Sequence, residues 1–349
     1  MKILKKILLF ILITIIITST LIGSSQNNMY VTTRKPVKVG VFLYNFNDPY
    51  LSLLKQNLED IQKENENKVE FSFYDGKANQ TIQNESIDQV LKKDVDLLIL
   101  SLADPKTDEI QDIINKIIQK NIPLILYLDP TPTMTNFIKS YNRALIVATD
   151  AEQSGILQGK ILVDAWNTDK KAIDKNGDNI MQYVMLHGET DSPIAIARTK
   201  YSVLTINDAG IKTEKLALKF CDWNQECAKN AIKSLLLNYS NKIEVIIANN
   251  DAMAIGAIEA LQEYGYNKGD KAKTIPVVGI DAIPAAQNLI KKGFMTGTVV
   301  QDPRAAAEAL YTVGMNLVSG KNALEGTNYN FDNTGIAIHL PYHEYINIK

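Results

Sequence analysis

Acidic and amide residues stand at the ends of five apolar runs: Asp48, Asp104, Asp129, the run Asn249, Asn250, Asp251, and Asp281. Ligands of open parallel sheets bind beyond the carboxyl ends of the strands, so these side chains are candidates for a binding site. Taken alone, each is better explained as a helix cap, because Asp and Asn are common N-cap residues. Together they favour a cleft in which carboxylates and carboxamides bind vicinal hydroxyls and an aromatic ring covers the apolar face of a sugar.

A second cluster of oxygen donors has the spacing of a calcium-binding EF-hand loop. Side-chain oxygens fall at positions 1, 3, 5 and 9 and a main-chain carbonyl at position 7, from Asp174, Asn176, Asp178, Gln182 and Ile180 in that order. The twelfth position is Met185, so the bidentate carboxylate must come from elsewhere. Asn179 replaces the usual glycine at position 6, which asparagine tolerates. By spacing alone, a calcium site and an ordinary solvated acidic turn are equal alternatives.

These residues need a scaffold, and the first half of the chain predicts a parallel sheet. Short apolar, β-branched runs alternate with longer stretches of helical period. The predicted strands are 37–43, 69–74, 97–101, 122–128 and 144–148, and the predicted helices are 49–62, 81–92 and 105–119. Alternation of this kind indicates helices on both faces of a parallel sheet.

The alternation of strand and helix patterns begins again in the second half of the chain. Thr149 and Glu152 predict a capping box for a helix that runs to Trp166. Further strands are expected at 181–186, 216–219, 243–248, 276–280 and 296–300. Because the pattern occurs twice, we expect an α/β protein with two Rossmann-like, doubly wound parallel-sheet lobes.

Composition limits the function classes. The chain has 349 residues, 46% hydrophobic and 22% charged, which suits about two folded domains. Its 37 Lys and Arg against 39 Asp and Glu give a formal charge of −2, so no excess basicity is available for nucleic acid. The segment from Gly155 to Lys160 is one residue short of a phosphate-binding loop and lies inside a predicted helix, where its glycines are expected to allow close packing.

Catalytic signatures are weak. His187, His339 and His343 lack metal-ligand spacing, and no Gly-x-Ser-x-Gly motif occurs. An acid pair such as Asp48 and Asp281 does not by itself indicate a glycosidase. We therefore expect a binding protein rather than an enzyme, with a glycoside hydrolase as the minor alternative.

The N-terminus has the pattern of a signal peptide or an uncleaved membrane anchor over residues 1–34. Three lysines precede an aliphatic run from 7 to 23, and the next charged residue is Arg34. The first 220 residues contain no Cys, which argues against a lipid-modified cysteine. Lysines hold the N-terminus of a retained helix in the cytoplasm, so the body is expected to be secreted or held on the outer face of the membrane.

The two cysteines, Cys221 and Cys227, bracket Trp223. A strand that ends at Cys221 and a helix that begins near Asn224 would bring the two within reach of a disulfide that fixes the tryptophan. Two free buried thiols are the alternative, and export of the chain favours the bridge.

Four segments resemble the periplasmic D-galactose/D-glucose-binding family, within the type I periplasmic sugar-binding proteins. They are VKVGVFLYNFNDPY (37–50), GIKTEKLALKFCDW (210–223), KIEVIIANNDAMAIGAIEAL (242–261) and IPVVGIDAIPAA (275–286). The likeness implies two lobes joined by three crossings near 147–150, 300–302 and 339–342. The expected lobes are 35–148 with 302–338, and 149–301 with 339–349.

The resemblance also implies which residues bind the sugar. Asp48 matches a hydroxyl-binding aspartate of the first lobe, and Tyr50 replaces a stacking phenylalanine. The arginine, second stacking aromatic, asparagine and aspartate of the other lobe are matched by Arg198, Trp223, Asn250 and Asp281. In the calcium loop, the resemblance supplies the missing carboxylate as Glu244 and makes the ion structural.

At the other end of the site the chain departs from the family. Ser192 and Ile194 stand at a histidine and an aspartate position, and Gln301 replaces an asparagine. A further asparagine becomes Leu128 or, with a one-residue slip, Asp129. In the family these positions contact the anomeric oxygen, ring oxygen and hydroxymethyl group, and a buried unpaired hydroxyl costs about 1–3 kcal/mol. We therefore expect weak glucose or galactose binding and a ligand with a different far end: a pentose, deoxy-sugar, glycoside or modified hexose.

Three functions follow from these expectations. The protein feeds a monosaccharide or sugar derivative to an ABC permease, or it is a membrane-anchored sugar sensor for a histidine kinase, or it hydrolyses a sugar derivative. The absence of an early cysteine favours the anchored version somewhat. The expected partners are thus a sugar and an ABC permease or sensor kinase, without nucleic acid, and the expected state is a monomer.

Overall fold

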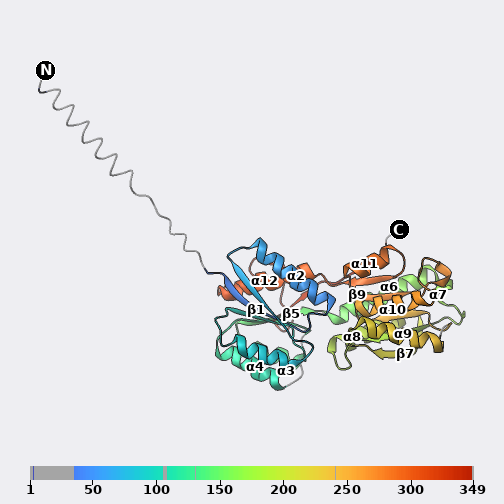
Figure 1. The fold of residues 1–349 in the computed structure, drawn as a ribbon, viewed down its shortest axis with the longest axis horizontal. Coiled ribbons are helices and arrows are strands. Elements are labelled where there is room, and N and C mark those ends of the chain that lie inside the picture. The colour runs from blue at the N-terminus through green and yellow to red at the C-terminus, as the bar shows by residue number, and fades with distance from the viewer. Residues whose placement is uncertain (1–2, 4–34, 105–107, 130, 240, 348–349) are drawn as a thin grey trace. The chain divides into compact units, whose positions relative to one another are not determined.

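The computed structural model describes residues 3, 35–104, 108–129, 131–239 and 241–347 (Figure 1). The predicted signal peptide or anchor lies, except for Ile3, outside these residues. None of the described helices has the length and apolar character needed to cross a membrane. From Pro36 onward the chain forms one compact unit.

The first sheet contains six parallel strands in the order β11-β5-β4-β3-β1-β2. Its strands are β1 (Val37–Leu43), β2 (Val69–Asp75), β3 (Leu97–Leu100), β4 (Leu124–Tyr127), β5 (Ala144–Thr149) and β11 (Ala337–Leu340). Its helices are α2 (Pro49–Glu64), α3 (Gln80–Val90), α4 (Asp108–Gln119), α5 (Pro132–Lys139) and α12 (Pro303–Val318). In Figure 1, α2 and α12 cover one face of this sheet, and α3 and α4 cover the other.

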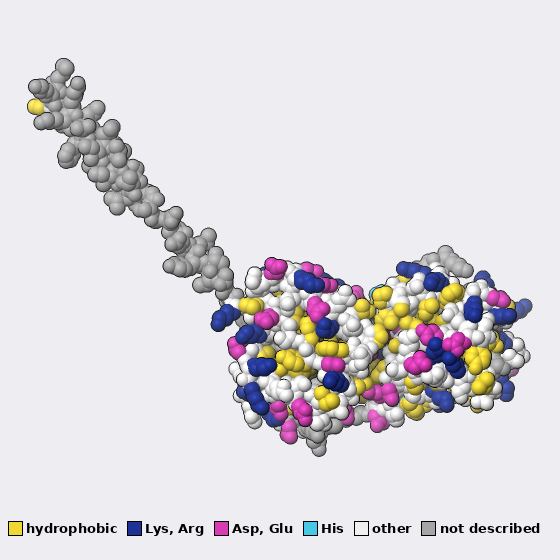
Figure 2. Space-filling view, in the orientation of Figure 1, with side chains coloured by type: hydrophobic (Ala, Val, Ile, Leu, Met, Phe, Trp, Pro, Cys, Tyr) yellow, Lys and Arg dark blue, Asp and Glu magenta, His cyan; other side chains and the backbone are white. Residues whose placement is uncertain are grey.

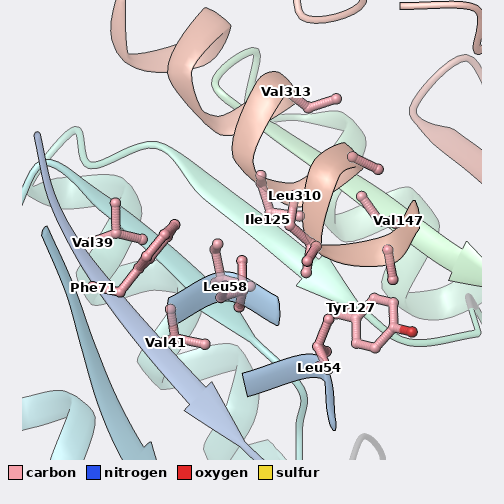
Figure 3. Packing of buried hydrophobic residues seen from close by; sticks show 14 of the residues in the cluster. Val39, Val41, Leu54, Leu58, Phe71, Ile125, Tyr127, Val147, Leu310 and Val313 are labelled. Carbon is pink, nitrogen blue, oxygen red and sulfur yellow. The ribbon is translucent and has the colours of Figure 1, made fainter. Parts of the chain in front are cut away.

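Alternation along the buried strands explains the two helical layers. In β1, Val39 and Val41 face α2 and α12, whereas Phe42 packs with the residues of α3 and α4. Figure 3 shows Leu54 and Leu58 of α2 close to these strands, together with Leu310 of α12. Both faces of the sheet are therefore buried, as expected for a parallel sheet.

The second sheet has the order β12-β10-β9-β8-β6-β7. Its strands are β6 (Ile180–His187), β7 (Lys212–Phe220), β8 (Val245–Ala248), β9 (Val277–Asp281), β10 (Gly297–Val300) and β12 (His343–Ile346), and only the β10–β12 pairing is antiparallel among these. Its helices are α6 (Ala151–Thr168), α7 (Lys170–Ile173), α8 (Pro193–Asp208), α9 (Gln225–Tyr239), α10 (Asp251–Glu263), the 3₁₀ turn η1 (Lys271–Lys273) and α11 (Pro284–Lys291). One hydrophobic cluster lies between this sheet and α9 to α11, and another lies toward α6 to α8.

The two-lobed α/β fold is thus confirmed. The chain passes between the sheets after β5, after β10 and after β11, close to the three expected crossings. The strands β11 and β12 were not among the predicted strands. On the face shown in Figure 2, Lys and Arg side chains are interspersed with Asp and Glu, in keeping with the near-neutral charge.

The predicted capping box is wrong. Asp150, not Thr149, caps α6, and its side chain accepts a hydrogen bond from the Gln153 amide at 2.9 Å. Thr149 instead ends β5 and pairs with Leu340 of β11. Because strand pairing holds Thr149 in the sheet, the helix begins one residue later than the capping-box pattern indicates.

The glycines of α6 do allow close packing, as expected. A Cβ atom on Gly159 would lie 2.4 Å from the Ser202 carbonyl oxygen, and one on Gly155 would lie 3.0 Å from the Arg198 carbonyl oxygen. Larger side chains at these positions would therefore push α8 away from α6. The contact matters for the site, because α8 carries Arg198.

Candidate functional site

A single cavity of about 440 Å³ brings the strand ends of both sheets together, and its volume is typical of a small-molecule site. All nine residues predicted to contact a sugar line it: Asp48, Tyr50, Asp129, Ser192, Arg198, Trp223, Asn250, Asp281 and Gln301. Asp104, a further predicted strand-end acid, also lines it. The rule that sites form at the carboxyl ends of parallel strands therefore located one shared cavity from separate parts of the chain.

Asp48 and Asn250 serve as helix caps within the cavity wall. Asp48 Oδ1 accepts the Leu51 amide at 2.9 Å, and Asn250 Oδ1 accepts the Met253 amide at 3.0 Å. Burial raises the pKa of Asp48, although main-chain donors and Arg198 oppose the shift. Capping and cavity lining are therefore compatible, since each side chain keeps acceptor capacity beyond the bond that caps its helix.

Arg198 is buried at the centre of the site, with 5% of its surface exposed. Its Nη1 donates to the Asn249 carbonyl oxygen at 2.8 Å, and its Nη2 donates to Gln301 Oε1 at 3.0 Å. Its Nε is buried and has no hydrogen-bond partner among the described residues. The two hydrogen bonds fix the position of the guanidinium. Its Nε remains a donor without an acceptor.

A hydroxyl and amide network links the two lobes at the floor of the cavity. Tyr50 and Tyr127 share a hydrogen bond of 2.6 Å between their hydroxyls, and Gln301 Nε2 donates to the Tyr127 hydroxyl at 3.2 Å. The Tyr342 hydroxyl donates to Gln301 Oε1 at 3.1 Å. Gln301 thus uses both ends of its amide within the protein, so its role at the β10 crossing includes holding Arg198 in place.

Asp281 ends β9 and has a φ of 125°, a region that non-glycine residues rarely adopt. Burial raises its pKa well above the ordinary value, opposed by the nearby Arg198 and supported by Asp251. Asp251 lies behind the cavity and accepts the Thr298 hydroxyl at 2.6 Å and the Ile283 amide at 2.9 Å. Burial raises the pKa of Asp251 to about 7. The site is therefore rich in carboxyl groups that burial biases toward protonation.

Trp223 sits on a loop of unusual backbone conformation, with a φ of 63°. Its indole lies against Gly188, where an added Cβ would come within 2.4 Å of the ring. Asn250 Nδ2 donates to the Trp223 carbonyl oxygen at 3.3 Å, and the Arg198 guanidinium lies 5.9 Å from the ring centroid. These contacts place an aromatic plate beside the buried arginine.

Part of the cavity lining is apolar. Leu102, Leu128, Pro193 and Ile194 all contribute to it. Ser192 caps α8, and its Oγ accepts the Ala195 amide at 3.4 Å. At the two positions where the resemblance implies a histidine and an aspartate, this chain has Ser192 and Ile194.

Asp129 and Leu128 both line the cavity, so the structure does not choose between them as the residue that replaces the family asparagine. Asp129 Oδ1 accepts the Thr149 hydroxyl at 2.8 Å, and its Oδ2 accepts the Ala151 amide at 3.0 Å. Burial raises the pKa of Asp129 to about 6. Both oxygens therefore hold the crossing between β5 and α6.

Sequence reasoning missed a contact across the cavity. The Tyr44 hydroxyl, which follows β1, donates to the carboxylate of Glu189, which follows β6. Burial raises the pKa of Glu189. Both residues lie just beyond strand ends, so the rule that found Asp48 would also have found them if it had been applied to tyrosine and to the strand 181–186.

The six predicted calcium ligands come together at the start of β6. Glu244 is buried, and its oxygens accept the main-chain amides of Lys175 at 2.7 Å and Gln182 at 3.1 Å. Burial raises its pKa, and the nearby carboxylates of Asp174 and Asp178 add to the rise. Asp174 Oδ1 and Gln182 Oε1 are buried acceptors with no partner among the described residues, which fits an unmet demand for a cation.

The backbone of the loop 174–182 also fits a calcium-binding loop at its sixth position. Asn179, at the position where glycine is usual, has a φ of 65°. In the described part of the chain, no group of three or more His, Cys, Asp or Glu side chains is arranged to hold a metal ion. A cation here would therefore depend on amide and carbonyl oxygens, from Asn176, Gln182 and Ile180, as well as on carboxylates.

Comparison with known proteins agrees with this architecture. The solute-binding protein of an ABC transporter from Actinobacillus succinogenes, solved with bound D-allose, matches 89% of this chain and 98% of its own with a TM-score of 0.72 at 21% identity. The corresponding protein from Bacillus halodurans, solved with myo-inositol, matches 89% and 95% with a TM-score of 0.71 at 23% identity. These two likenesses concern the fold.

Sequence similarity goes further. The D-galactose/methyl-galactoside binding periplasmic protein of Haemophilus influenzae is 35% identical over 307 residues, which are 87% of this chain and 88% of that protein. The model of the periplasmic binding protein domain matches residues 39–322. The resemblance that the four segments indicate is thus confirmed, and the chain belongs to the periplasmic binding protein domain family.

Proposed function

We propose that this protein is the extracytoplasmic sugar receptor of an ABC importer and that its lobes close on a monosaccharide or sugar derivative. The observation that carries this proposal is the shared cavity, in which Asp48 of one lobe faces Arg198, Trp223 and Asp281 of the other. Carboxylates and a guanidinium suit vicinal hydroxyls, and the indole suits the apolar face of a sugar ring. Membership of the family implies the extracytoplasmic location.

Ligand binding would draw on groups that the protein already holds in place. Arg198, whose Nε has no partner among the described residues, would supply a donor, and Asp281, which lines the same cavity, would supply an acceptor. A sugar first docks on one lobe and then bridges both. Closure is then a population shift, driven by the contacts that the ligand gains only when both lobes touch it.

The aliphatic residues of the cavity lining would govern the choice of sugar. Ile194 and Leu128 offer no partner to a buried hydroxyl, and leaving one unpaired costs about 1–3 kcal/mol. We therefore expect free glucose and galactose to bind less tightly than a sugar that has no hydroxyl facing these residues. A pentose, a deoxy-sugar, a glycoside and a modified hexose all meet this condition.

The test is a thermal-shift screen of the purified protein with hexoses, pentoses, deoxy-sugars and glycosides, followed by calorimetry of the hits. At least one sugar should raise the Tm, and its binding should change tryptophan fluorescence. If no member of the panel raises the Tm or releases heat, the sugar-receptor proposal is wrong. Tight glucose binding would instead overturn only the proposed selectivity.

The importer is preferred over the sensor and the hydrolase because both solved structures described above are of ABC transporter solute-binding proteins. The sensor alternative depends on an anchor in residues 1–34, nearly all outside the described residues. Neighbouring permease and ATPase genes would support import, whereas a kinase and response-regulator pair would support sensing. Turnover of a glycoside panel by the purified protein would establish hydrolysis.

We also propose that the loop 174–182 binds Ca²⁺ with a structural role. Asp174, Asn176, Asp178, the Ile180 carbonyl, Gln182 and Glu244 would hold the ion. Bound calcium would neutralise the carboxylates around Glu244 and satisfy the orphaned acceptors of Asp174 and Gln182.

Removal of calcium tests this site. Chelation should lower the Tm by roughly 5 °C or more, because an ion at 100 times its Kd stabilises a fold by about 2.7 kcal/mol. The control is Glu244→Gln, whose Tm should no longer respond to chelator or added calcium. An unchanged wild-type Tm, with no heat of calcium binding to chelator-treated protein, would show that the loop is an ordinary acidic turn.

A further inference from the structure

The two cysteines of the chain lie side by side next to the cavity. Cys221 follows β7 and is buried, and Cys227 lies in the first turn of α9 and is exposed. Their sulfur atoms are 2.6 Å apart. The turn between them is closed by main-chain and side-chain bonds: the Asn224 amide donates to the Cys221 carbonyl oxygen, and the Cys227 amide donates to Asn224 Oδ1. The backbone therefore holds the two thiols in contact.

The residues enclosed by the two thiols have a strained backbone. Asp222 and Trp223 are consecutive non-glycine residues with φ of 47° and 63°. For a residue as bulky as tryptophan this region is a true outlier. Such conformations persist only where the surroundings enforce them, and they concentrate at ligand-binding sites. A covalent link across the turn would be one such constraint.

This turn determines where the Trp223 indole lies. The ring packs on Gly188, and the Trp223 carbonyl oxygen is held by Asn250 Nδ2 at a long 3.3 Å. Asn250 and Trp223 both line the cavity. Loosening the turn would therefore let the aromatic plate leave the position that faces Arg198.

We propose that Cys221 and Cys227 form a disulfide in the exported protein, and that this bridge fixes Trp223 in its ligand-ready position, so that ligand affinity depends on the redox state of the surroundings. The effect on affinity rests on the proposed sugar-binding function, whereas the bridge itself does not. An extracytoplasmic location provides the oxidising conditions in which disulfides persist.

The bridge forms by thiol–disulfide exchange with an external disulfide, such as that of a thiol oxidoreductase or oxidised glutathione. The exposed Cys227 attacks as a thiolate, forms a mixed disulfide and releases one sulfur of the oxidant as a thiol. Cys221 then attacks Cys227 Sγ, loses its proton and releases the second sulfur. The two cysteines are oxidised by two electrons, and the external disulfide is reduced to two thiols. Burial raises the pKa of Cys221, which makes its thiolate scarce, so the second step depends on the 2.6 Å approach of Cys221 Sγ to Cys227 Sγ.

The first measurement needs no ligand. Wild-type protein equilibrated with oxidised glutathione should lose two hydrogen atoms in mass and resist alkylation by iodoacetamide, and dithiothreitol should restore two alkylation sites. The matched control is Cys227→Ser, which alters an exposed side chain and should show no such mass loss. If the wild-type protein keeps two reactive thiols, or acquires glutathione without forming the internal bridge, the proposal is wrong.

The second measurement compares ligand affinity in the two redox states, using the best sugar from the thermal-shift panel. Oxidised wild-type protein should bind it about three- to tenfold more tightly than reduced protein, because the bridge removes the cost of ordering the indole. Cys227→Ser should bind like the reduced form in either buffer, and Cys221→Ala should behave the same way. Equal affinities of oxidised and reduced wild-type protein would overturn the redox dependence. Failure of every sugar to bind in both states would count against the sugar-receptor proposal, while the alkylation result would still decide whether the bridge forms.

Discussion

The residues that line the cavity form two sets, which differ in how far they match the residue types that the family resemblance implies. The resemblance implies sugar-contacting roles for the first set, which consists of Asp48, Arg198, Asn250, Asp281 and Trp223. We call this set the gripping end. We call the second set the altered end; it consists of Leu128, Asp129, Ser192, Ile194 and Gln301, the positions at which the resemblance implies a different residue type.

The two sets also differ in how much hydrogen-bonding capacity they leave for a ligand. At the gripping end the polar groups retain free bonding capacity, as the unpaired Arg198 Nε shows. At the altered end the polar groups are already occupied: Asp129 holds the β5 crossing, and Gln301 bonds to Arg198 and Tyr127. A ligand therefore finds directional partners mainly at one end. This asymmetry predicts recognition of a shared diol together with tolerance of a variable far end.

The gripping end should show the largest mutational effect. Trp223→Ala removes the aromatic plate and is expected to weaken binding of the best sugar by roughly 100-fold, which corresponds to about 2–3 kcal/mol and is typical of buried aromatic anchors. Isothermal titration calorimetry measures the change directly. The matched control is Trp166→Phe, because Trp166 is buried in the core between the second sheet and α6 to α8. An unchanged affinity of Trp223→Ala would show that the indole is part of the core rather than of the site.

At the altered end, we expect Asp129 to affect the stability of the fold more than the affinity for the ligand. The pKa of Asp129 rises from 3.8 to about 6 in the folded protein, a difference of at most about 3 kcal/mol. Because the raised pKa means that the folded state binds this proton more tightly than the unfolded chain, the contribution is fully present below pH 3.8 and is lost as the pH rises through about 6. The free energy of unfolding of the wild type should therefore fall more between pH 4 and 7 than that of Asp129→Asn.

Asp129→Asn is a suitable comparison because an amide oxygen still accepts the Ala151 amide, and the Thr149 hydroxyl rotates to accept from Nδ2. Other acids titrate equally in both proteins, so the difference between the two pH profiles isolates this group. Urea unfolding at four pH values measures it. Parallel profiles, with a large loss of sugar affinity in the variant, would place Asp129 among the ligand-gripping residues and break the distinction between the two ends.

Much of the fold was predictable because the inner strands of both sheets are parallel and buried on both faces. Strands of this kind appear as continuous apolar runs, and β1 coincides with its prediction from Val37 to Leu43. The strand β11 was missed because the exposed His339 interrupts its apolar run, and β12 was missed because it is largely exposed at the edge of its sheet. The α6 cap was mispredicted by one residue because pairing with β11, a long-range contact, overrides the local capping signal at Thr149.

The strand-end acids and amides of the cavity were predictable for a related reason, since the ends of parallel strands converge by topology, whereas Arg198 and Trp223 were predicted from the family resemblance. Sequence could not decide between Leu128 and Asp129, because the first two residues after β4 both line the cavity. Nor could it foresee the contact between Tyr44 and Glu189, which depends on how far apart the lobes lie. Sequence also could not show which polar side chains use all their hydrogen-bonding groups within the protein. The Gln301 amide does so at both ends, and its partners are known only from the folded structure.

The smallest effect tests the altered end by reversing one of its changes. Ile194→Asp restores a carboxylate at the cavity wall and is expected to tighten galactose or glucose binding by roughly tenfold, since a charged acceptor for an otherwise unpaired hydroxyl is worth about 1.5 kcal/mol. The same change should weaken binding of a sugar with an apolar group at this end, because that group would then desolvate a charge. Ile194→Leu is the control for packing and should leave both affinities nearly unchanged. If Ile194→Asp weakens all sugars equally, this wall does not face the far end of the ligand, and the selectivity must arise from Ser192 and Leu128.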